Sequence, residues 1–129
     1  MGKTILVADD DRNIVEMLKG NFVSRGYNVI TAYDGRTALD LIKLHRPDIA
    51  ILDIMMPNID GFTLGMEARD KEELRRMPII FMTGETEIGG LFDKEKKFNI
   101  SGWFNKPFNV DNLVAKVEKV ISGKQVKPT

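Results

Sequence analysis

The stretch "DIAILDIMMPNIDG", residues 48–61, changes within a few positions from apolar residues to one acid and then to a turn. Its first five residues are Asp48 and then four apolar residues, Ile49 to Leu52, a run that is typical of a strand buried on both faces of a sheet. Asp53 follows this run directly, and Pro57 and Gly61 indicate a loop. The stretch therefore predicts a buried strand that delivers a single carboxylate to the start of a loop.

Similar apolar runs recur along the chain and predict five strands, at residues 4–8, 28–32, 48–52, 78–82 and 102–105. Helical spacing follows each strand, at Ile14, Leu18 and Phe22, at Ala38, Leu41 and Ile42, at Phe62, Met66 and Arg69, at Ile88, Leu91 and Phe92, and at Leu113, Val117 and Ile121. Gly89 and Gly90 predict a late or loose start for the fourth helix. This alternation predicts an α/β fold, a doubly wound five-stranded parallel sheet with five helices on its two faces.

Helix ends are marked by Gly26, by Arg46 and Pro47, and by Gly123. We expect one domain over residues 1–123. Residues 124–129, "KQVKPT", are expected to be a flexible tail or the start of a linker.

Composition excludes several classes of protein. The chain has no cysteine and one histidine, His45, so disulfides, thiolate metal sites and histidine clusters are excluded. Nineteen basic residues balance nineteen acidic ones, which argues against nucleic-acid binding by general phosphate attraction. No run approaches the ~20 apolar residues that a bilayer crossing needs. We therefore expect a soluble, cytoplasmic protein without a membrane or nucleic-acid partner.

Polar side chains stand where the predicted strands end. Asp9 and Asp10 follow the first strand, Asp53 the third, Thr83 the fourth and Lys106 the fifth. In an open parallel sheet, ligands bind beyond these carboxyl ends. We therefore expect three acids, a hydroxyl and an ammonium at one edge.

Converging carboxylates need a positive partner, because two of them about 5 Å apart repel by roughly 3 kcal/mol at an effective dielectric of 20. Oxygen ligands without histidine or cysteine favour a hard cation such as Mg²⁺, and Lys106 adds a further positive charge. Such an edge suits a phosphoryl group, for which Asp53 is the candidate nucleophile.

Four motifs in this order, "ILVADD" (5–10), "ILDIMMPNIDG" (51–61), "IIFMTGE" (79–85) and "FNKPF" (104–108), resemble the receiver domain of two-component response regulators. The resemblance covers nearly the whole chain. It implies a flavodoxin-like sheet of order 2-1-3-4-5, the topology of the family's chemotaxis member.

The resemblance also implies the chemistry of the site. Asp53 would accept a phosphoryl group from the phosphohistidine of a sensor histidine kinase or phosphotransfer protein. Asp10, Asp53 and the backbone carbonyl of Met55 would hold Mg²⁺ directly, and Asp9 would act through water. This would make the chain a signalling module and not an enzyme, with at most slow self-dephosphorylation.

Switching residues are implied in the same way. Thr83 and Lys106 would contact the phosphoryl group, Trp103 occupies the family's switch position, and the Lys106–Pro107 bond matches the family's cis peptide. Phosphorylation would alter the face of the fourth helix, fifth strand and fifth helix, read by an effector or by an output domain missing from this chain. Ordinary packing of Trp103 remains the alternative, and whether phosphorylation drives dimerisation stays open.

Two other functions are compatible with the fold. A flavodoxin-like module binding a nucleotide such as FMN is disfavoured by the acids at the phosphate position. An aspartyl-phosphate phosphohydrolase is disfavoured because Met55, two residues after Asp53, is not a second acid. Apolar Met55 instead leads to the hypothesis that hydrolysis of the acyl phosphate is slow.

Overall fold

The computed structural model describes residues 2–84 and 100–123. The helical spacing at Ile88, Leu91 and Phe92 and the predicted tail at 124–129 lie outside these ranges. The described elements are β1 (Thr4–Ala8), α1 (Arg12–Val23), β2 (Asn28–Ala32), α2 (Gly35–His45), β3 (Ile49–Asp53), α3 (Gly61–Arg69), the short 3-10 helix η1 (Glu72–Leu74), β4 (Ile79–Thr83), β5 (Gly102–Asn105) and α5 (Val110–Ser122).

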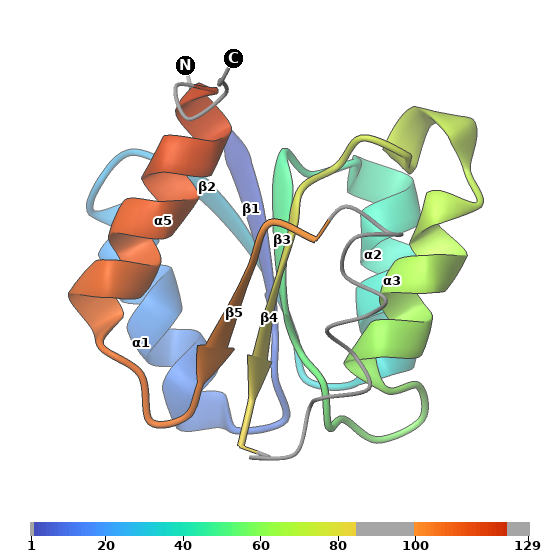
Figure 1. Cartoon of the computed structure of the whole chain (residues 1–129), viewed down its shortest axis with the longest axis horizontal. Helices are drawn as coiled ribbons and strands as arrows, with labels where there is room; N and C mark the ends of the chain where they lie inside the picture. The colour runs from blue at the N-terminus through green and yellow to red at the C-terminus, as the bar shows by residue number, and fades with distance from the viewer. Residues whose placement is uncertain (1, 85–99, 124–129) are drawn as a thin grey trace.

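The five strands form one sheet of order β2-β1-β3-β4-β5, and every neighbouring pair is parallel. This confirms the doubly wound α/β fold and the strand order that the resemblance implied. Figure 1 shows α1 and α5 on one face of the sheet and α2 and α3 on the other. Four of the five predicted helices therefore lie in the described part of the chain, on both faces of the sheet.

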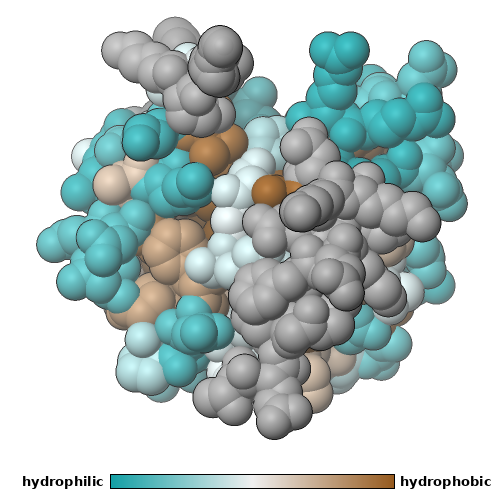
Figure 2. All heavy atoms as spheres, viewed as in Figure 1, coloured by the Kyte–Doolittle hydropathy of each residue, from teal (hydrophilic) through white to brown (hydrophobic). Residues whose placement is uncertain are grey.

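Alternate residues of each central strand enter different halves of the core. In β1, Ile5 and Val7 pack on the side of α1 and α5, whereas Leu6 and Ala8 pack on the side of α2 and α3. All four side chains are fully buried. In the view of Figure 2, hydrophilic residues dominate the outer side of α5, and apolar residues show between α5 and the sheet. The continuous apolar runs of the sequence are thus explained by burial on both faces.

Two strands begin and end one residue later than predicted, β3 at Ile49–Asp53 and β4 at Ile79–Thr83. Asp48 remains outside β3, and its carboxylate accepts a hydrogen bond from the Thr4 amide at 2.7 Å. Pro78 has no amide hydrogen to donate to a ladder. As a result, Asp53 and Thr83 are the last residues of their strands and not the first residues of the following loops.

Helix ends follow the predicted signals. Arg46 closes α2 at φ 48° and Gly123 closes α5 at φ 75°, both left-handed. Gly26, at φ 93°, stands three residues after the end of α1. Among the helices described, none has the length and apolar character needed to cross a membrane.

Candidate phosphoacceptor site

The sheet brings the predicted polar residues to one edge. Asp53 pairs with Met82 in the ladder between β3 and β4, and Thr83 pairs with Asn105 between β4 and β5. The Asp9 amide continues the β1 ladder by donating to the Ala32 carbonyl at 3.2 Å. The main chain at Asp9, Asp53 and Thr83 is therefore positioned by strand pairing.

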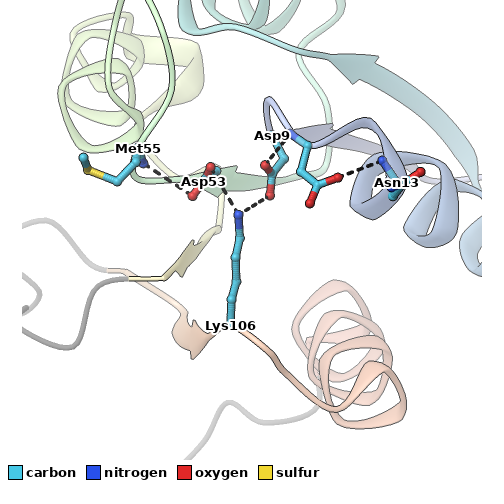
Figure 3. Close-up of polar contacts among 6 residues, drawn as sticks. Asp9, Asn13, Asp53, Met55 and Lys106 are labelled. Carbon is cyan, nitrogen blue, oxygen red and sulfur yellow. Dashed lines mark hydrogen bonds and ion pairs between the residues drawn. The ribbon is translucent and has the colours of Figure 1, made fainter.

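Lys106 connects the two buried acids. Its Nζ lies 2.8 Å from Asp9 Oδ2 and 3.3 Å from Asp53 Oδ2. Figure 3 shows the lysine side chain extending between the two carboxylates. The Lys106 amide donates to the Thr83 carbonyl at 2.8 Å. This bond joins the start of the loop after β5 to the end of β4. Asp9 and Thr83 are fully buried and Asp53 nearly so.

The ionised form of the Asp53 carboxyl is destabilised by its surroundings. Burial, and then repulsion from Asp9, raise its pKa from 3.8 to about 6, although Lys106 acts in the opposite direction. For Lys106, desolvation lowers the pKa, but its hydrogen bond to Asp9 and its attraction to Asp53 outweigh that effect and raise the pKa overall. One ammonium thus leaves the pair of acids incompletely neutralised.

A cation fits this arrangement. Carboxylate oxygens of Asp9, Asp10 and Asp53 all lie within 4.8 Å of one another. Asp10 is exposed, whereas the other two are buried, so the cluster opens to solvent on one side. The all-oxygen donor set, the open side and the raised pKa of Asp53 suit a hard divalent ion that keeps part of its water shell.

The residues after Asp53 line the same site. The Met55 amide lies 3.4 Å from Asp53 Oδ1, and Met55 is 56% exposed. Figure 3 places the thioether on the side of Asp53 away from Asp9. The structure therefore brings to one edge the carboxylates of Asp9, Asp10 and Asp53, the Lys106 ammonium and the main chain of Met55 and Thr83. The sequence predicts the three acids, Thr83 and Lys106 at this edge, and the resemblance adds Met55.

Trp103 lies apart from the carboxylates. It is partly buried on the face covered by α2 and α3, and its ring centroid is 5.2 Å from that of Phe81. Its neighbour Phe104 faces the opposite half of the core. The Lys106–Pro107 peptide is cis, as the resemblance implied.

Sequence reasoning missed the role of Gly61. A Cβ atom at this position would lie 2.1 Å from the Asp53 carbonyl oxygen, so only glycine allows α3 to start this close to β3. The Gly61 amide also donates to the Ile54 carbonyl at 2.8 Å. The signal was present as an Asp-Gly pair at 60–61, which the sequence repeats at 34–35.

The profile of the response regulator receiver domain matches residues 5–118. The chain belongs to the response regulator receiver domain family. The receiver domain of a Francisella response regulator is 28% identical, with a TM-score of 0.84 over 96% of this chain and 100% of that one. The chemotaxis response regulator CheY4 of Vibrio cholerae is 32% identical, with a TM-score of 0.84 over 93% and 99%.

A third similar receiver domain belongs to a sensor histidine kinase of Pseudomonas aeruginosa. It is 26% identical to this chain, with a TM-score of 0.81 over 95% of this chain and 99% of that one. A magnesium ion is coordinated in the active-site cleft of that protein. The present chain therefore shares its fold with the receiver domains of response regulators and with that of a histidine kinase.

Proposed function

We propose that this receiver domain accepts a phosphoryl group on Asp53 from the phosphohistidine of a sensor histidine kinase or phosphotransfer protein. The observation that carries the proposal is the position of Asp53, a buried carboxylate that belongs to the acidic cluster and lies 3.3 Å from the Lys106 ammonium. A phosphoryl dianion on Asp53 could therefore be neutralised by two positive charges, the Lys106 ammonium and a divalent ion at the acidic cluster.

In the transfer step, one carboxylate oxygen of Asp53 forms a bond to phosphorus while the bond from phosphorus to the imidazole nitrogen breaks. The electron pair of the broken bond stays on that nitrogen. The ring leaves as neutral imidazole when its other nitrogen already carries a proton, and otherwise it takes up a proton from water. The product is an acyl phosphate on Asp53. The nucleophile must be ionised, which the raised pKa of Asp53 still permits at neutral pH.

Asp10, Asp53 and the Met55 carbonyl would hold Mg²⁺, and Asp9 would support it through water. When bound, the ion neutralises charge on the transferring phosphoryl oxygens. The Lys106 ammonium, already 3.3 Å from Asp53, adds a second positive charge that stabilises the product. Asp9 keeps the Lys106 ammonium in place through their 2.8 Å ion pair.

The phosphorylated state is proposed to act through Thr83 and Trp103. A phosphoryl group on Asp53 attracts the Thr83 hydroxyl, and the change passes to the surface of β5 and α5, where an effector or output domain reads it. Charge-assisted hydrogen bonds from Thr83 and Lys106 contribute about 1.5–3 kcal/mol each. Their sum approaches the roughly 5.5 kcal/mol that reverses a 1:99 equilibrium.

The test uses phosphoramidate, whose phosphorus–nitrogen bond matches that of phosphohistidine. With MgCl₂, the parent protein should form an adduct that hydroxylamine removes, as expected of an acyl phosphate, and EDTA should prevent its formation. Asp10→Asn should reduce the rate, whereas Asp11→Asn is the matched control because asparagine can still cap α1 at the Asn13 amide. Equal labelling of the parent and Asp53→Asn would overturn the proposal.

A further inference from the structure

The loop that follows Asp53 is held at two places. At its end, the Gly61 amide bonds the Ile54 carbonyl at 2.8 Å. In its middle, the Gly35 amide of α2 donates to the Pro57 carbonyl at 3.1 Å. Residues 54–60 are therefore bridged between β3 and the first turn of α2, an element that lies elsewhere in the sequence.

The contact with α2 leaves no room for a side chain. A Cβ atom on Gly35 would lie 1.8 Å from the Ile59 carbonyl oxygen and 2.8 Å from the Ile59 Cβ. Because the nearest obstacle is backbone, the loop itself would have to move. Gly35 thus sets how closely the loop approaches α2.

The loop also has a constrained backbone at Asn58. This residue has φ 72°, in the left-handed region, and the Ile59 amide donates to the Pro57 carbonyl at 2.9 Å across it. Asparagine tolerates this conformation, whereas β-branched residues do not. The tight turn at Asn58 presents the Pro57 and Ile59 carbonyls to α2.

Met55 lies between the two attachment points. Its amide is 3.4 Å from Asp53 Oδ1, so a displacement of the loop would also displace the main chain beside the acceptor. Outer contacts that orient metal ligands typically change metal affinity by tenfold or more when they are removed. A change in the distance between Gly35 and the loop should therefore change the affinity of the site for its metal ion.

We infer that Gly35 is a positioning residue for the divalent-cation site, acting through the docking of the 57–59 turn on the first turn of α2. The inference rests on the proposed function, because it needs the Met55 main chain to contribute to Mg²⁺ binding. It adds α2 to the elements that build the site, although no side chain of α2 reaches the carboxylates in the described part of the structure.

The experiment measures the rise in unfolding temperature of EDTA-treated protein as MgCl₂ is added, which yields a dissociation constant by linkage. Gly35→Ala should raise that constant roughly tenfold. Gly20→Ala is the control, because it makes the same change in α1, where nothing lies within 4 Å of the new Cβ. A Gly35→Ala protein that binds Mg²⁺ as tightly as the parent would overturn the inference.

A second pair of variants tests the inference even if Gly35→Ala does not fold. Asn58 is exposed, so its replacement leaves the core intact. Asn58→Val forbids the left-handed turn and should weaken Mg²⁺ binding, whereas Asn58→Gly allows the same φ and should retain it. Equal constants for these two variants would contradict the inference alone. A parent protein whose unfolding temperature ignores MgCl₂ would overturn the proposed metal site, and the inference with it.

Discussion

The ammonium of Lys106 lies 3.3 Å from a carboxylate oxygen of Asp53, although the two residues are separated by more than fifty positions; Asp53 ends β3 and Lys106 follows β5. The same ammonium holds Asp9 at 2.8 Å. Removing it would leave two buried acids without this partner. The stability of the metal-free protein should therefore depend on Lys106.

Lys106→Met removes the charge and keeps an apolar side chain of similar length. In EDTA at about pH 8, we expect a loss of about 3 kcal/mol in the free energy of unfolding, since breaking a buried ion pair leaves an uncompensated charge. Lys19→Met, at an exposed position of α1, should change stability by less than about 0.5 kcal/mol. Denaturant unfolding measures both, and equal losses would contradict the role of Lys106.

Asp53 should make stability depend on pH. Its pKa is raised to about 6 by burial and by Asp9, so the folded protein binds this proton more tightly than the unfolded chain. Its contribution to stability is complete below the unfolded pKa and is lost as the pH rises through the folded one.

Asp53→Asn should remove the fall in stability that Asp53 causes as the pH rises. In EDTA, the variant should be more stable than the parent above about pH 7, and the difference should vanish below about pH 4. Asp40→Asn, at an exposed position of α2, serves as the control. A gain that is the same at every pH would contradict the assignment of the titration to Asp53.

Trp103 provides an optical test of the switch because it is the only tryptophan of the chain. If phosphorylation turns the indole further inward against Phe81, its emission should shift to shorter wavelength on addition of Mg²⁺ and acetyl phosphate. Asp53→Asn should show no such shift. Identical spectra for the two proteins under these conditions would reject the coupling and leave Trp103 as a packing residue.

Met55 is expected to set the lifetime of the acyl phosphate, because its amide lies 3.4 Å from Asp53 Oδ1, the residue is exposed, and its thioether offers water no strong hydrogen bond. Met55→Asn should shorten the half-life roughly fivefold, the effect of one hydrogen bond of about 1 kcal/mol. Met55→Leu should leave it unchanged. The decay of the phosphorylated species by intact mass measures all three, and an unchanged half-life in Met55→Asn would reject the hypothesis.

Much of the fold was predictable because the central strands are buried on both faces and their apolar runs end abruptly at polar residues. Asp53, Thr83 and Lys106 could be assigned to one edge for this reason alone. Alternation of strands and helices does not specify which strands are neighbours, so the order depended on the resemblance.

Other features were not predictable from local patterns because distant segments determine them. Asp48, just before β3, is bonded to the Thr4 amide, a contact that joins residues 44 positions apart. The requirement for glycine at position 35 arises from the Ile59 carbonyl. In both cases the sequence shows the residue but not the contact that constrains it.

Asp53 is the single phosphoryl acceptor in the proposed function. Intact mass spectrometry after incubation with acetyl phosphate and MgCl₂ should show one added group of ~80 Da on the parent protein, the mass of one phosphoryl group. Asp53→Asn should remain unmodified under the same conditions. An equal mass increase on both proteins, or none on the parent, would contradict the assignment.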